Sequence, residues 1–293
     1  MNLLQAIFLG IVQGLTEFLP VSSSGHLAIL KNIFKMNTDT GILYDILLHV
    51  ATLISVCVVM SRDVLRLFFE GIGILVDLFG NLKIFIDNKS GKNNEDEYVP
   101  IITNSYRKFA IMVIVSTIPT AFLGFLLKDI IETVETELLV PGICLLATGG
   151  ILLMTDYISD KGKKPKDATM LDALAVGAAQ GVATLPGLSR SGTTIAACIL
   201  CGMERRFAVK YSFIMSIPAI LGALLLEIKD IGEEGVKAAE IPCYIVGMIV
   251  AAVVGFVALK FMVRLVTNNK FKYFAYYCLA IGVLSIIGYI ILL

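Results

Sequence analysis

Long apolar stretches separated by short polar segments dominate the pattern of the chain. Each long stretch comes close to the ~20 apolar residues that a helix needs to cross a bilayer. We therefore predict transmembrane helices at residues 43–61, 108–127, 138–157, 211–228, 242–262 and 274–293. A further stretch, 64–88, is interrupted by charged residues, so it either crosses the membrane or lies along its surface as an amphipathic helix.

Two other apolar segments, 3–34 and 170–203, are broken in the middle. The breaks are the turn-forming sequences 20–25 and 186–192, each of which contains Pro, Ser and Gly. The halves on either side are too short to cross a bilayer, so each segment predicts a re-entrant helical hairpin. Non-helical backbone at membrane depth is tolerated where it is buried in protein or lines a cavity, and we expect the two turns there.

The two predicted hairpins are copies of each other. With a shift of 167 residues, residues 4–25 match residues 171–192 at 8 of 22 positions without a gap. The matches include the Gln-Gly pair at 13–14 and the Ser-x-Ser-Gly block at 22–25. We interpret the chain as an internal duplication, with repeat 1 at residues 1–157 and repeat 2 at residues 158–293.

The composition supports a membrane protein. Hydrophobic residues make up 57% of the chain and charged residues 16%, whereas a soluble domain has ~25% charged residues. This excludes a water-soluble enzyme, a nucleic-acid-binding protein and a disordered chain. The predicted fold class is an all-α polytopic membrane protein.

The placement of charge predicts how the repeats are oriented. The acidic loops are 128–137 and 229–241, and the basic loops are 158–170, 204–210 and 260–272. Cytoplasmic loops are enriched in Lys and Arg, so the basic loops are predicted inside and the acidic loops outside. Successive loops alternate between the two sides in this way only if residues 62–107 form a cytoplasmic or interfacial insert that does not span. Each repeat then has one hairpin and three spans, which inverts the second repeat. Inverted repeats with broken helices share a site near the bilayer midplane.

The first hairpin carries an acid and a histidine. Gln13 and Glu17 are four residues apart and share a helix face. A carboxylate at this depth costs ~3 kcal/mol unless it is paired, hydrated or bound to a cation. Ser22–Ser24 suit a helix N-cap, and the free N–H groups of such a helix start also bind anions. His26 has the chemistry of a nucleophile or general acid/base, whereas His49 is predicted to be a packed residue in its span.

The second hairpin carries the opposite charge. Arg190 stands where the first copy has Ser23. Hydroxyl side chains surround it in the sequence, at Ser189, Ser191, Thr193 and Thr194. An Arg among hydroxyls at a helix start is typical of phosphate binding, because the guanidinium offers two parallel N–H donors. The alternative is an ion pair between Arg190 and Glu17 that joins the hairpins, and both hold if substrate opens the pair.

At these residues the sequence resembles the bacterial undecaprenyl-diphosphatase family, the bacitracin-resistance phosphatases, over essentially its whole length. The resemblance is carried by Gln13 and Glu17, by Phe-Leu-Pro-Val-Ser-Ser-x-Gly-His ending at His26, and by Pro-Gly-x-Ser-Arg-Ser at 186–191. It implies an inverted-topology repeat with two re-entrant hairpins. It also implies hydrolysis of undecaprenyl diphosphate to the monophosphate and phosphate, a requirement for Mg²⁺ or Ca²⁺, and an active site that opens to the outer face of the plasma membrane.

The resemblance also assigns roles to individual residues. The expected catalytic residues are Glu17, His26 and Ser23. The expected substrate-binding residues are Arg190, Ser189, Ser191, Thr194 and Ser22. The expected metal ligands are Glu17 and Gln13, although many members of the family have Glu at the second of these positions, so this site has one less negative charge. The nucleophile stays open between His26, Ser23 and direct attack by water.

The predicted function is therefore hydrolysis of a polyprenyl diphosphate lipid by a multi-pass protein of the bacterial cell membrane. The expected partners are this lipid and the bilayer, with no nucleic acid, and a homodimer is left open. The alternative is an inverted-repeat transporter or flippase for an anionic lipid or phosphate-bearing cargo, because broken helices at the midplane are also typical of transporters.

Overall fold

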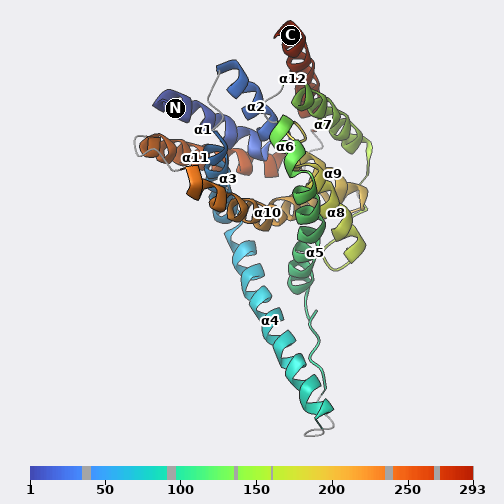
Figure 1. The fold of residues 1–293 in the computed structure, drawn as a ribbon. Helices are drawn as coiled ribbons and strands as arrows, with labels where there is room; N and C mark the ends of the chain where they lie inside the picture. The colour runs from blue at the N-terminus through green and yellow to red at the C-terminus, as the bar shows by residue number, and fades with distance from the viewer. Residues whose placement is uncertain are drawn as a thin grey trace.

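The computed structural model describes residues 1–34, 41–90, 97–134, 138–159, 161–234, 240–266 and 271–292, which fold as helices joined by turns and loops (Figure 1). The helices of the predicted first repeat are α1 (Leu3–Phe18), α2 (Ser23–Phe34), α3 (Gly41–Val59), α4 (Ser61–Lys89), α5 (Ser105–Leu126), α6 (Lys128–Val134) and α7 (Leu139–Tyr157). Those of the predicted second repeat are α8 (Met170–Val182), α9 (Arg190–Leu200), α10 (Arg205–Glu234), α11 (Ile241–Val266) and α12 (Phe271–Leu292).

The long helices confirm the predicted fold class of an all-α polytopic membrane protein. Among the described residues, five helices are long and apolar enough to cross a bilayer, namely α5, α7, α10, α11 and α12. Helices α3 and α4 meet this criterion together, but they are bent by 92° relative to each other. Each of the six predicted spans thus corresponds to one observed helix or, for residues 43–61, to the first arm of the bent pair.

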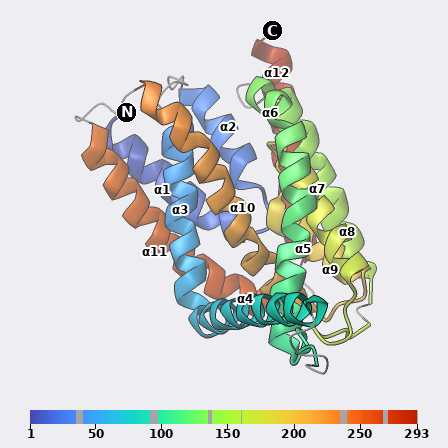
Figure 2. The same ribbon diagram turned by 60° about the horizontal axis from the view of Figure 1, so that its bottom comes forward.

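Helix α4 runs across the ends of α3 and α5 (Figure 2). Glu70 and Asp77 on its polar face bind Arg107 at the start of α5. Arg107 Nε donates to Glu70 Oε2 at 3.1 Å, and the same guanidinium forms an ion pair with Asp77. Its opposite face exposes apolar side chains, Phe68 and Phe79 among them. An amphipathic helix perpendicular to its neighbouring span fits the interpretation of residues 64–88 as a surface-lying segment, which stays a prediction.

Both broken segments form pairs of short helices that pack against the other half of the chain. Helix α1 contacts α2 and packs along α11, while α8 contacts α9 and packs along α5. Glycines of the duplicated sequence allow the close approach, since a Cβ on Gly10 would lie 2.6 Å from the Gly247 oxygen and one on Gly177 would lie 2.2 Å from the Ser116 oxygen. Small residues at such crossings let membrane helices pack backbone to backbone.

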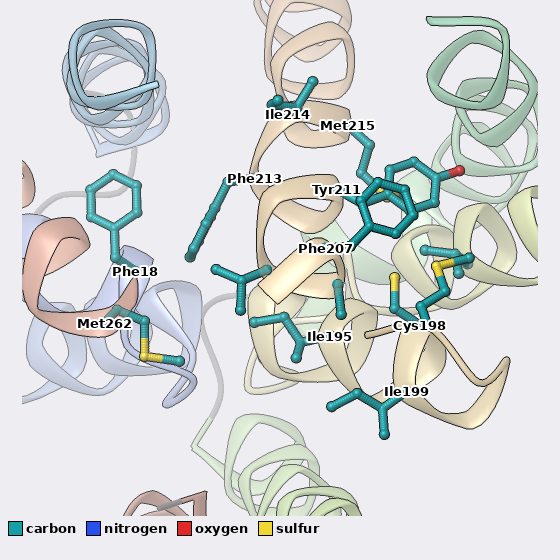
Figure 3. Packing of buried hydrophobic residues seen from close by; sticks show 14 of the residues in the cluster. Phe18, Ile195, Cys198, Ile199, Phe207, Tyr211, Phe213, Ile214, Met215 and Met262 are labelled. Atoms are coloured by element: carbon teal, nitrogen blue, oxygen red, sulfur yellow. The ribbon is translucent and has the colours of Figure 1, made fainter. Parts of the chain in front are cut away.

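A buried hydrophobic core fixes the hairpins to the bundle (Figure 3). Phe18, at the end of α1, packs edge-to-face on Phe213 of α10 with ring centroids 5.6 Å apart. Ile195 of α9 and Met262 of α11 belong to the same buried cluster. The end of the first hairpin's leading helix is therefore held at a fixed position relative to α9 and α10.

Candidate active site where the hairpin turns meet

The first hairpin turn joins the end of α1, which carries Glu17, to the start of α2 at Ser23. Helix α1 ends at Phe18, since Leu19 precedes a proline and adopts extended backbone. Ser22 adopts a left-handed conformation with φ of 68°, which is sterically unfavourable for a residue with a Cβ. Its Oγ accepts a hydrogen bond of 3.2 Å from the Gly25 N–H, so it caps α2. Such strain is typical of functional sites.

The second hairpin turn uses the same cap. Ser189 Oγ accepts from the Gly192 N–H at 3.1 Å, and the Ser189 N–H donates to Thr148 Oγ1 at 3.0 Å. The cap makes Arg190 the first residue of α9, as Ser23 is the first residue of α2. The two turns touch, because a Cβ on Gly25 would lie 2.8 Å from the Gly187 Cα. The starts of α2 and α9 are thus brought together.

Glu17 is the centre of the polar network between the turns. Its Oε1 pairs with the Arg190 guanidinium, and its Oε2 accepts hydrogen bonds from Ser23 Oγ at 2.7 Å and Gln13 Nε2 at 3.0 Å. The Glu17 side chain is 6% exposed and that of Arg190 is 24% exposed. The ion pair predicted from the sequence is therefore present, and it joins the two predicted repeats.

His49, predicted only as a packed residue in its span, also belongs to this network. Its Nδ1 lies 3.2 Å from Glu17 Oε2 and 2.9 Å from Gln13 Nε2. It comes from α3, which contacts α1. An ionisable residue at membrane depth is by default a functional candidate, and this rule would have singled out His49.

His26 lies in the first turn of α2 and faces another helix. Its Nδ1 is 2.7 Å from the Ser22 carbonyl oxygen, and its Nε2 is 2.8 Å from the Tyr277 hydroxyl of α12. The two rings are parallel within 3°, with centroids 5.6 Å apart. The sequence reasoning missed Tyr277, because its contact with His26 spans 251 positions of the chain.

The remaining predicted hydroxyls make contacts within the second hairpin and its neighbours. Thr194 is fully buried, and its Oγ1 donates to the Arg190 carbonyl oxygen at 2.8 Å and lies 2.5 Å from Ser212 Oγ. Ser191 Oγ is 3.5 Å from Ser189 Oγ, and both residues are buried. These contacts stiffen the first turn of α9, which carries Arg190, and direct contact of these hydroxyls with substrate stays a prediction.

Glu17 and Gln13 are the candidate ligands for a hard divalent cation at this site, as the sequence predicts. The described residues contain no group of three or more His, Cys, Asp or Glu side chains that could hold a metal. The Gln13 Oε1 atom, however, is buried without a hydrogen-bond partner beside the Glu17 carboxylate. Mg²⁺ and Ca²⁺ prefer carboxylate and amide oxygens, and Mg²⁺ in particular completes its shell with substrate phosphates and water.

Comparison with known proteins identifies the family. The sequence model described as bacitracin resistance protein BacA matches residues 6–284. The chain is 37% identical over 292 residues to a protein of Methanosphaera stadtmanae, covering 100% of both chains. It is 42% identical over 283 residues to a protein of Treponema denticola, covering 96% of each chain. Both relatives are named undecaprenyl-diphosphatase, which confirms the resemblance seen in the motifs. The chain belongs to the bacitracin resistance protein BacA family.

Proposed function

We propose that this protein is an integral membrane phosphatase that hydrolyses undecaprenyl diphosphate to undecaprenyl phosphate and inorganic phosphate. Its family and its relatives named undecaprenyl-diphosphatase support this activity. The product is the lipid carrier of cell-wall synthesis, so the enzyme recycles that carrier. The structural observation that carries the proposal is the contact of Glu17 with both Arg190 and Ser23 between the two hairpin turns.

Substrate binding uses the charge that the second hairpin contributes. The Arg190 guanidinium is the more exposed partner of the ion pair, and it turns from Glu17 to the incoming diphosphate, where it makes two parallel hydrogen bonds. The N–H groups at the starts of α2 and α9 add donors beside it. The diphosphate therefore lies between the two turns, and its prenyl chain extends into the bilayer.

Glu17 and Gln13 are the residues that would hold Mg²⁺ or Ca²⁺. The bound ion supplies positive charge that offsets the charge of the diphosphate. The unpartnered Gln13 Oε1 supports this assignment.

Ser23 is the nucleophile that the geometry favours. Its hydroxyl already donates to Glu17 Oε2 at 2.7 Å, which is the distance expected between a nucleophile and its base. The Ser23 oxygen forms a bond to the terminal phosphorus as its proton passes to Glu17. The bond from that phosphorus to the bridging oxygen breaks, and undecaprenyl phosphate leaves. Water then hydrolyses the phosphoserine and releases inorganic phosphate.

The membrane arrangement that we propose is an inverted-topology repeat in the cell membrane, with the active site open to the outer face. Reciprocal packing supports it, since α1 packs along α11 and its counterpart α8 packs along α5, the counterpart of α11. The basic loops support a cytoplasmic position for residues 158–170 and 204–210.

A transport function is not favoured by the site. Translocation of an anionic lipid needs Arg190, but it does not need a hydroxyl hydrogen-bonded to a buried carboxylate. The direct test is phosphate release from undecaprenyl diphosphate by the purified protein in detergent, with and without EDTA. We expect release that EDTA abolishes and Mg²⁺ or Ca²⁺ restores; no release by the metal-loaded protein would overturn the proposed function.

The nucleophile is tested by trapping. With substrate labelled at the terminal phosphate, acid quenching and peptide mapping should locate the label on Ser23. Ser23→Ala should lower kcat by a factor on the order of a thousand or more, as loss of a nucleophile does in other hydrolases, while the neighbouring Ser24→Ala serves as the matched control. Label on His26, or on neither residue, would contradict the serine mechanism.

A further inference from the structure

The two ring nitrogens of His26 are fixed by different partners. A carbonyl oxygen can only accept a hydrogen bond, so Nδ1 of His26 carries a hydrogen and donates it to the Ser22 carbonyl at 2.7 Å. In the neutral ring the lone pair then lies on Nε2. The Tyr277 hydroxyl, 2.8 Å away, donates to that lone pair. The nitrogen available for proton transfer is therefore the one that Tyr277 holds.

The contact does not arise from a mobile part of the chain. Cys278, the next residue on α12, is fully buried, and its Sγ lies 3.7 Å from the Pro20 carbonyl oxygen of the first hairpin turn. Helix α12 also packs along α7 over its length. Tyr277 is 43% exposed, so its hydroxyl reaches His26 from the border of the site and not from the core.

On the Nδ1 side of the His26 ring, the contact is made by a residue with a strained backbone. The Ser22 carbonyl that accepts from Nδ1 belongs to the residue with φ of 68°. In the second hairpin the counterpart Ser189 has φ of −71°, and Thr193 stands where His26 does in the first. Strain and the tyrosine contact thus accompany the histidine and are absent from the copy of the turn that lacks it.

We propose that Tyr277 is a positioning residue that holds the His26 ring in one orientation, with the lone pair on Nε2 kept for proton transfer at the diphosphate. This rests on the function proposed above. In the resting enzyme the phenol donates to Nε2. When substrate enters, the hydroxyl turns away from the ring, and Nε2 becomes free to accept a proton from the water that hydrolyses the phosphoserine. His26 therefore acts as a general base in the second step of the reaction.

Chemical labelling tests this contact without relying on catalysis. Diethyl pyrocarbonate transfers its ethoxycarbonyl group to the unprotonated imidazole nitrogen, and peptide mapping separates His26 from His49, the other histidine of the chain. In Tyr277→Phe the ring stack is kept and the donor is lost, so labelling of His26 should become about fivefold faster, which corresponds to loss of one hydrogen bond. Tyr276→Phe, an exposed neighbour on α12, is the matched control and should label at the wild-type rate.

Kinetics give the second measurement. Tyr277→Phe should lower kcat by a factor of about ten while KM changes little, because the general base is less well placed and binding by Arg190 is unaffected. The elution profile in detergent checks that each variant is folded. Unchanged labelling of His26 in Tyr277→Phe, with an active wild-type enzyme, would overturn the role of Tyr277 alone. A wild-type protein that labels as expected but releases no phosphate would overturn the proposed function and, with it, the role of Tyr277 in positioning a catalytic His26.

Discussion

The two hairpins share a scaffold and differ in the chemistry that they carry. In both turns a serine caps the second helix by accepting from the glycine three residues later, Ser22 from Gly25 and Ser189 from Gly192. The loss of either cap would cost about 1 kcal/mol. These interactions occur at positions that align when the two hairpin sequences are compared with a shift of 167 residues, so the second helix of each hairpin starts with the same cap.

The charged positions have diverged. The first hairpin has Glu17, whereas the second has Thr184 at the aligned position, which bonds to the Gly181 carbonyl oxygen of its own helix at 2.7 Å. The aligned glutamines also differ, since Gln13 contacts Glu17 while Gln180 donates to Thr120 Oγ1 at 3.3 Å. One hairpin supplies the anion and the other the cation, and only the folded pair forms a site.

The largest effect is expected when the cation of the second hairpin is removed. Arg190→Ala should lower kcat/KM by about a thousandfold or more, the range found for arginines that contact a transferring phosphoryl group. The measurement is phosphate release, with Arg206→Ala, an exposed arginine at the start of α10, as the matched control. Near-normal kcat/KM in Arg190→Ala would show that the second hairpin does not bind the diphosphate.

Stability separates binding from the structural role of the ion pair. Arg190→Ala leaves the Glu17 carboxylate buried without its cation, which costs ~3–5 kcal/mol in buried pairs. We therefore expect a lower Tm in detergent. The double variant Glu17→Gln with Arg190→Met should recover much of that Tm and stay inactive. A double variant as unstable as the single one would argue against the pair as the cause.

A smaller effect is expected at the neighbour of Glu17 on α3. His49→Ala removes the imidazole beside Glu17 and Gln13 and should lower kcat/KM by ~10–100-fold, as loss of a residue that orients a metal ligand does. The concentration of Mg²⁺ or Ca²⁺ that gives half-maximal activity should rise as well. Ser216→Ala, at the aligned position of the second repeat, is the control. Equal losses in both variants would mean that the two spans act only through packing.

The site was predictable from the sequence where local pattern determines it. The duplication aligns Ser23 with Arg190, and helical spacing puts Gln13 and Glu17 on one face, so the pairing of acid and arginine followed from sequence. His49 and Tyr277 were missed because their contacts depend on how α3 and α12 pack against the hairpins. Hydropathy gives the existence of those helices, and it does not give the face that each turns toward the site.

The smallest effect tests the backbone difference between the two caps. A glycine keeps most of the stability of an N-cap, with a loss of a few tenths of a kcal/mol, and it relieves the ~1–2 kcal/mol cost of a left-handed residue with a Cβ. Ser22→Gly should therefore raise Tm, because φ is 68° there. Ser189→Gly should lower it, because φ of −71° carries no such cost and glycine adds flexibility to the unfolded chain. Thermal unfolding in detergent measures both, and shifts of the same sign would show that the left-handed turn is not what distinguishes the hairpins.

Activity should distinguish Ser22→Gly from Ser189→Gly further. In Ser22→Gly the turn is more flexible and holds the carbonyl that orients His26 less firmly. We therefore expect a lower kcat in Ser22→Gly, although it is the more stable variant.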